Sequence, residues 1–284
     1  MNEGLASEAT KHSPRGQASI PWADAHYFGR GVFLFFTGCR RLLAFTLITL
    51  GVLGTKWRVA SEVTFPSVRV ELAGAGLRLL PMFLFMSAAL GLAVIAQTVS
   101  WLGRLGANSY LGTILVAVVV RELGPLLTAL LVLSRAGARY SIDLATMRAL
   151  GEVEALEALG IDPIHYLVVP RVIGMALGVF ALTVFFILGV LGFGYLFAFL
   201  NGIPLRPGEF ATSIADALSA LDFGFLAIKS LLFGTVIGVI TCYHGLSQPL
   251  RVAEVSRASV RGMIQSVVAC VLIDMLFVLV YLAV

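Results

Sequence analysis

The sequence predicts an all-α membrane protein, in which an N-terminal interfacial helix precedes five transmembrane helices and a short cytoplasmic helix joins spans two and three. Of its 284 residues, 59% are hydrophobic and only 13% are charged, and the mean hydropathy is +0.96. Five runs carry almost no charge and reach the roughly 20 residues that cross a bilayer. Because a soluble domain carries about 25% charged residues, soluble enzymes and nucleic-acid-binding proteins are disfavoured.

The N-terminal part divides into a tail and an amphipathic region. Residues 1–25 are polar and have no apolar core of a signal peptide, so we expect a disordered cytoplasmic tail. In region 26–78, the apolar stretch 32–54 is interrupted by Arg40 and Arg41, and each arginine would cost about 2.5 to 3.5 kcal/mol at a bilayer centre. We therefore expect a helix that lies flat in the interface. Insertion as a sixth span is the open alternative.

The remaining residues, 79–284, form the predicted five-span domain. Its spans are located by runs of apolar residues that hold at most two charges each. The predicted spans are 79–103, 109–133, 172–200, 223–243 and 263–284.

The distribution of basic residues predicts the orientation. Sixteen of the twenty Lys and Arg residues lie in the N-terminal region and in segments 134–171 and 244–262, which all fall on one side of the membrane. The positive-inside rule assigns that side to the cytoplasm. We expect a cytoplasmic N-terminus and a C-terminus on the outer side.

Span two contains a charged pair, Arg121 and Glu122, followed by Pro125. Charge at this depth requires an aqueous cavity, a partner or a functional role. Adjacent side chains of a helix point about 100° apart, so at least one of the two should reach another helix. Pro125 frees the carbonyl of Arg121 and favours a kink. We interpret the pair as a polar point on a substrate path or a gate, with Gln97 of span one as another polar candidate, and a purely structural salt bridge as the alternative.

Two further charged residues lie inside predicted spans. Lys229 in span four and Asp274 in span five have similar depths, which predicts an intramembrane ion pair within reach of a lysine stem. A proton or ion relay through these residues and Glu122 is the alternative.

The cytoplasmic segment between spans two and three contains the pattern GEVEALEALGIDP at 151–163. Three glutamates follow one another along it while apolar residues recur at helical spacing, and a glycine ends the pattern. We predict a short acidic amphipathic helix that suits a basic groove of a cytosolic partner. The residues assigned to this contact are Glu152, Glu154, Leu156, Glu157, Gly160 and Asp162.

We expect no metal or other cofactor and no catalytic residues. The three cysteines form no C-x-x-C pair, and no histidine lies at metal-ligand spacing. A phosphate-binding G-x-x-x-x-G-K-[ST] motif is also absent. Energy for any transport must therefore come from another chain or from an ion gradient.

The run from Arg121 to Arg171, RELGPLLTALLVLSRAGARYSIDLATMRALGEVEALEALGIDPIHYLVVPR, closely resembles the signature of the MlaE/YrbE-type permease family. These permeases are the membrane subunits of Mla and Mce lipid-transporting ABC systems. The resemblance extends from about residue 65 to the end and includes SRASVR at 256–261.

The resemblance implies a homodimer in the bacterial inner membrane, bound to cytosolic ABC ATPases and to periplasmic MCE-domain lipid-binding proteins. Mla-type systems add a STAS-domain subunit. By resemblance, Arg121 and Glu122 match a polar point near the lipid cavity, and Glu152 to Gly160 fall in the coupling helix that contacts the ATPase.

These expectations define a non-catalytic permease subunit that moves phospholipid or a related lipid between the inner membrane and periplasmic partners, in outer-membrane lipid homeostasis. The alternative is a proton-coupled secondary transporter that uses Glu122, Lys229 and Asp274. A structural membrane scaffold is a third reading.

Overall fold

The computed structural model of the chain describes residues 44–49, 51, 79–106, 110–200, 207–246 and 255–283, and every regular element in these ranges is helical. The predicted all-α class is confirmed. The expected tail, 1–25, lies outside the described residues, and so does most of region 26–78. Of the stretch 32–54, residues 44–49 and 51 are described, and they are helical.

Five helical segments are long and apolar enough to cross a membrane, which confirms the predicted number of spans among the described residues. Span one is α3 (Leu80–Leu105), span four is α10 (Ala220–Leu246) and span five is α11 (Val255–Ala283). Spans two and three are composite segments, Leu111–Ala149 and Ile164–Leu200.

Spans two and three are longer than the charge-free runs that predict them. They contain 39 and 37 residues, or about 58 and 55 Å at 1.5 Å per residue, against about 30 Å of hydrocarbon. The predicted spans are shorter than the helices because the length of a charge-free run reflects only the thickness of the hydrocarbon. The helices continue past that run with charged residues such as Arg135 and Arg139.

Both composite segments contain π-helical stretches. Span two runs through α4 (Leu111–Leu115), the π-helix η3 (Val116–Leu123), α5 (Gly124–Val132), the π-helix η4 (Leu133–Gly137) and α6 (Ala138–Ala149). Span three begins with the π-helix η5 (Ile164–Val168) and continues as α8 (Val169–Leu200).

Two of the π-helices end two residues before a proline. Pro125 follows η3, and Pro170 follows η5. A proline removes one backbone donor and its ring crowds the preceding turn, so the helix widens locally. The kink expected at Pro125 takes this form, a widened turn that contains Arg121 and Glu122.

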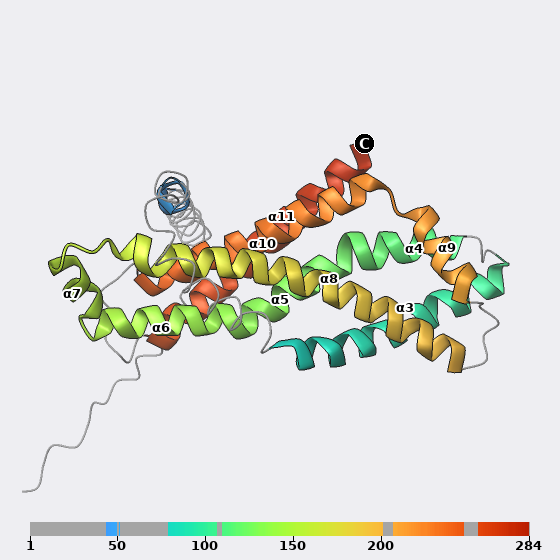
Figure 1. Cartoon of the computed structure of the whole chain (residues 1–284), viewed down its shortest axis with the longest axis horizontal. Helices are drawn as coiled ribbons and strands as arrows, with labels where there is room; N and C mark the ends of the chain where they lie inside the picture. Colours follow the sequence, from blue (N-terminus) through green and yellow to red (C-terminus); the bar gives the residue numbers. More distant parts are fainter. Residues whose placement is uncertain are drawn as a thin grey trace, which may run out of the picture. The chain divides into compact units, whose positions relative to one another are not determined.

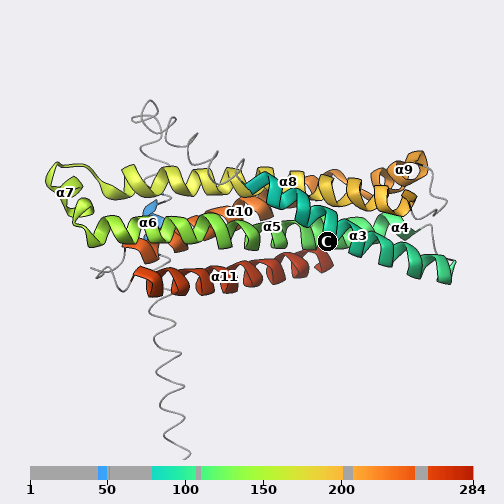
Figure 2. The same ribbon diagram turned by 90° about the horizontal axis from the view of Figure 1, so that it is seen from below.

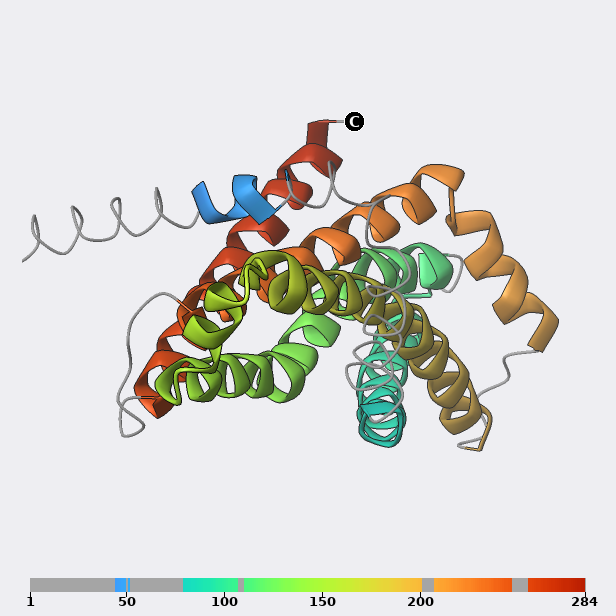
Figure 3. The ribbon, with the colours of Figure 1, turned by 60° about the vertical axis from the view of Figure 1, so that its left-hand side comes forward.

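Close contact between α3 and α8 depends on small residues. Figure 3 shows the two helices side by side. A Cβ atom on Gly91 would collide with the carbonyl oxygen of Val190 and lie 2.9 Å from the backbone nitrogen of Gly194. The two backbones therefore approach too closely for any side chain at this point.

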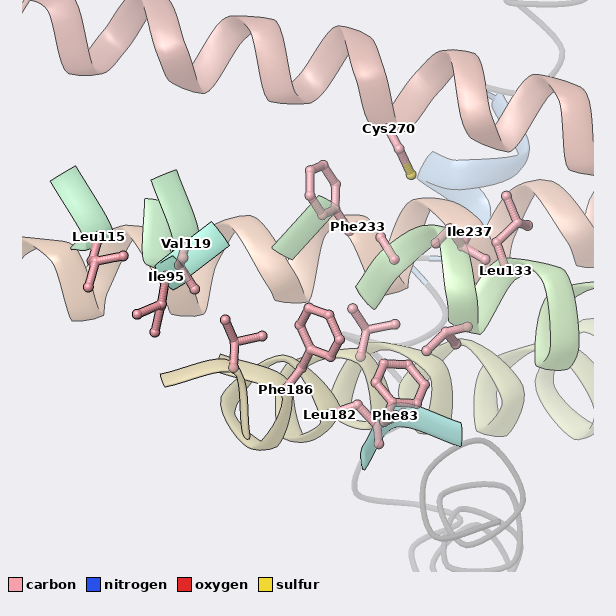
Figure 4. Close-up of a cluster of buried hydrophobic side chains, with 14 of the residues drawn as sticks. Phe83, Ile95, Leu115, Val119, Leu133, Leu182, Phe186, Phe233, Ile237 and Cys270 are labelled. Carbon is pink, nitrogen blue, oxygen red and sulfur yellow. The ribbon is translucent and has the colours of Figure 1, made fainter. Parts of the chain in front are cut away.

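The apolar core lies between α3, span two, α8 and α10 (Figure 4). The rings of Phe83 on α3 and Phe186 on α8 meet edge to face, with centroids 5.9 Å apart. Leu115 and Val119 of span two and Phe233 of α10 also belong to the cluster. Helix α11 packs beside α10 and α6.

Two short helices lie at opposite ends of the long ones (Figures 1 and 2). Helix α7 (Glu152–Ala158) joins spans two and three and is bounded by Gly151 and Gly160, whose φ angles of 78° and 77° favour glycine. Helix α9 (Pro207–Ala217) precedes α10 and packs on α4.

Replacement of Gly91 by Ala should lower the melting temperature of the detergent-solubilised protein, because overpacking costs about 1 to 3 kcal/mol. The matched control is Gly103→Ala on the same helix, where no atom lies within 4 Å of the added Cβ. That control should be neutral or slightly stabilising, since Ala favours helix over Gly. Equal melting temperatures for the two variants would contradict the close contact.

Candidate functional site

The charged pair of span two has partners on α10. The Arg121 guanidinium contacts Asp222 through two nitrogens, with Nε 2.8 Å from Oδ1 and Nη2 donating to Oδ2 at 3.1 Å. Glu122 accepts a hydrogen bond at Oε2 from Lys229 Nζ at 3.0 Å. The two adjacent side chains of η3 therefore diverge and are bound separately, as their angular spacing requires.

Lys229 of α10 is almost fully enclosed, with 1% of its side chain exposed. Its ammonium group lies 2.7 Å from Asp274 Oδ1, 3.0 Å from Glu122 Oε2 and 2.9 Å from the backbone carbonyl oxygen of Arg121. Two of these contacts are hydrogen bonds, to Glu122 and to the Arg121 carbonyl, and the contact with Asp274 is an ion pair. The structure thus brings Lys229 and Asp274 together and adds Glu122 to them.

The contact between Lys229 and the carbonyl of Arg121 follows from Pro125. In a regular helix this carbonyl would accept the N–H of residue 125, which a proline lacks. Lys229 Nζ takes the place of that donor at 2.9 Å. The proline and the lysine, 104 positions apart in the sequence, therefore form one structural unit.

Asp222 is the residue that sequence reasoning missed. Only 2% of its side chain is exposed, and its Oδ2 also accepts hydrogen bonds from the backbone N–H of Ser219 at 2.9 Å and from the Ser219 hydroxyl at 3.1 Å. Asp222 thus reaches back to Ser219 at the start of α10, which is one half of a capping box. The pattern Ser-x-x-Asp directly before an apolar run was the available signal.

Helix α11 contributes one face to the group. Asp274, Phe277 and Tyr281 follow one another at helical spacing, and the Tyr281 ring lies 5.1 Å from the Arg121 guanidinium carbon. The Phe277 ring lies 5.8 Å from Lys229 Nζ. Both aromatic faces are within the distance at which they attract a cation.

We call Arg121, Glu122, Asp222, Lys229 and Asp274 the charged cluster. Three of its members are largely buried, but the side chains of Arg121 and Glu122 are 34% and 32% exposed. The cluster therefore has an open side within a membrane-spanning segment. This arrangement can hold a charged group of a ligand.

Gln97 does not join the cluster. It lies on the exposed side of α3, a helix that packs against α8 and α4. Among the described residues, no group of three His, Cys, Asp or Glu side chains is placed to hold a metal ion.

The predicted partner-binding residues lie on and after α7. Val153 is buried and anchors the helix, whereas Glu152, Glu154 and Glu157 are exposed. Leu156 is half-buried. Arg148 of α6 lies 3.8 Å from Glu154, and this exposed ion pair contributes little to stability.

Gly160 and Asp162 shape the turn that follows α7. Gly160 adopts the left-handed conformation, and Asp162 Oδ1 accepts the backbone N–H of Ile164 at 3.0 Å. A pocket of about 330 Å³ lies beside this turn and is lined by Glu157, Asp162 and Tyr243, among other residues.

Known proteins match most of the chain. The family model described as Permease MlaE matches residues 70–280, a range that contains the whole charged cluster and α7. A probable ABC transporter permease protein of Rickettsia prowazekii (strain Madrid E) is 32% identical over 197 residues, covering 69% of this chain and 75% of its own length. Protein TRIGALACTOSYLDIACYLGLYCEROL 1, chloroplastic, of Arabidopsis thaliana is 29% identical over 269 residues, covering 93% of this chain and 72% of its own.

Lys229→Met alone should destabilise the protein by about 3 to 5 kcal/mol, because two carboxylates would lose their buried cation. The additional change Asp274→Leu should recover part of this loss, and Glu122→Gln in the same chain should recover more. Thermal unfolding in detergent measures each step. If the combined variants lose as much stability as the sum of the separate substitutions, these residues do not act as a unit.

Proposed function

This chain belongs to the MlaE permease family, and on that premise we propose that it is the membrane subunit of an ABC transporter that moves phospholipid or a related lipid. It is a multi-pass membrane protein. It carries out no covalent chemistry in this proposal, and a separate cytosolic ATPase supplies the energy.

One observation carries the proposal: a cluster of five charged residues with an open side lies within the membrane-spanning helices. Charges at this depth are expensive and are typical of a substrate pathway. A lipid needs a polar point for its headgroup and apolar surface for its chains, and the long helices provide the apolar surface. The name of the Arabidopsis relative, which contains a galactolipid, supports a lipid substrate.

We propose a homodimer, because the exposed sides of Arg121 and Glu122 are unsuited to contact with acyl chains. A second copy of the chain would enclose them in a shared cavity. Helix α11 is the least covered of the five spans, with 11% of its most apolar window buried. It therefore has surface available for a second copy or for lipid.

The proposed assembly lies in the bacterial inner membrane, with the N-terminus and α7 in the cytoplasm and the C-terminus in the periplasm. The basic residues that gather near α7 support this orientation. Periplasmic MCE-domain proteins would exchange lipid with the permease at the α9 end, and a STAS-domain subunit would bind in the cytoplasm in an Mla-type system. In this scheme the protein serves outer-membrane lipid homeostasis.

Helix α7 is the proposed coupling helix. Its glutamates are exposed and its anchor residue Val153 is buried, so it presents an acidic surface on a fixed base. A basic groove on the ATPase would complement that surface. Leu156, Gly160 and Asp162 hold its shape in this proposal.

Reversing the charge of Glu154 and Glu157 to Lys should weaken co-purification of the ATPase by about tenfold or more, since like charges would then face the groove. The matched control reverses Glu209 and Asp216 on α9, at the opposite end of the spans. Recovery of the same amount of ATPase with both double variants would refute docking through this face.

Glu122→Ala should slow lipid movement by about tenfold or more, the effect of removing one charged contact. Membrane insertion should survive, because Lys229 keeps Asp274 and the Arg121 carbonyl as acceptors. Transfer of labelled lipid in vesicles that contain the complete complex measures the rate, with Asp143→Ala at an exposed position of α6 as control. An unchanged rate would contradict the role of the cluster.

A proton-coupled secondary transporter is the second candidate, because Glu122 and Asp274 meet at one lysine. The same vesicles separate the two functions. The ABC proposal predicts that transfer stops without ATP or without the ATPase. Transfer that continues without the ATPase and collapses with the proton gradient would establish the second candidate.

A further inference from the structure

The charged cluster contains more negative than positive charge. Glu122, Asp222 and Asp274 supply three carboxylates, whereas Arg121 and Lys229 supply two cations. No other described Lys, Arg or His side chain contacts these carboxylates. The cluster therefore has one negative charge in excess, in a place where an unbalanced charge is costly.

The excess is concentrated at Glu122. Asp222 is buried against Arg121 and the Ser219 cap, and Asp274 is largely enclosed beside Lys229. Glu122 is the most exposed of the three carboxylates, and only its Oε2 atom is engaged by Lys229. Its side chain is 32% exposed, so the carboxylate is accessible to a ligand.

Both cations of the cluster are already engaged with its carboxylates. The Lys229 ammonium donates to Arg121 O and to Glu122 and forms an ion pair with Asp274. The Arg121 guanidinium uses one of its five N–H donors, on Nη2, for a hydrogen bond to Asp222. Its remaining donors, on a side chain that is one-third exposed, are suited to an anion.

The open side of the cluster thus presents two opposite charges on neighbouring residues, a cation at Arg121 and a carboxylate oxygen at Glu122. A zwitterionic phospholipid headgroup has the same two charges a few bonds apart. Its phosphate matches the guanidinium and its ammonium group matches the carboxylate. Because the two headgroup charges cancel, binding adds no further negative charge to the cluster.

We propose that this site selects phospholipids whose headgroup carries an ammonium group over anionic phospholipids, an inference that rests on the proposed function. Arg121 binds the phosphate and Glu122 binds the ammonium group. Asp222 pairs with that guanidinium and is itself held by Ser219. An anionic headgroup would raise the excess from one negative charge to two.

The test uses the complete complex in nanodiscs that contain equal amounts of phosphatidylethanolamine and phosphatidylglycerol. After extraction into detergent, mass spectrometry gives the ratio of the two lipids that stay bound. The unmodified protein should retain phosphatidylethanolamine with an enrichment of about tenfold, the ratio produced by one charge-assisted contact. Glu122→Gln, which has a similar shape and no charge, should abolish the enrichment, whereas the control Asp143→Asn at an exposed position of α6 should preserve it.

Retention of the two lipids in equal amounts by the unmodified protein would overturn the proposed selection and leave the lipid permease intact. Enrichment that persists in Glu122→Gln would overturn the role of the carboxylate. Retention of neither phospholipid would count against the proposed function itself. The measurement on the unmodified protein decides the question even where the variant fails to assemble.

Discussion

The cost of charge in hydrocarbon is the constraint on which this structure depends. Five charged residues from three spans occur within apolar helices, and each one lies against an opposite charge. Lys229 holds the group together because it joins span two to α10 and α11 through a single ammonium group. Away from water, the electrostatic attraction between opposite charges is stronger, and a charge without a partner destabilises the protein more. The same contacts therefore position the helices and define the candidate site.

The five spans could be predicted because hydrocarbon thickness leaves a direct trace in the sequence, a run of apolar residues of fixed length. The depth of Lys229 and Asp274 along their helices could be read in the same way, and the structure places them 2.7 Å apart. The additional contact with Glu122 could not be read, because it depends on how far span two is rotated and on the widened turn of η3. Asp222 was missed for a different reason: it lies at the end of a span, where an acidic residue looks like ordinary helix capping.

The backbone distortion before Pro125 was predicted only in part from the sequence. A kink was expected at Pro125, since its ring and missing donor disturb the preceding turn. In the structure the distorted turn is a π-helix, and Lys229 of another span donates a hydrogen bond to the Arg121 carbonyl that Pro125 leaves without a donor. π-helical turns are frequent at functional sites, and here the turn contains the two residues that are open to a ligand. The local defect and the polar site are one feature.

Spans two and three project far beyond the hydrocarbon and end at α7, the short helix between them. The segment Leu111–Ala149 contains Arg121 and Glu122 and ends just before α7. Unbroken helical backbone therefore connects the charged cluster to the base of α7, with no loop between them.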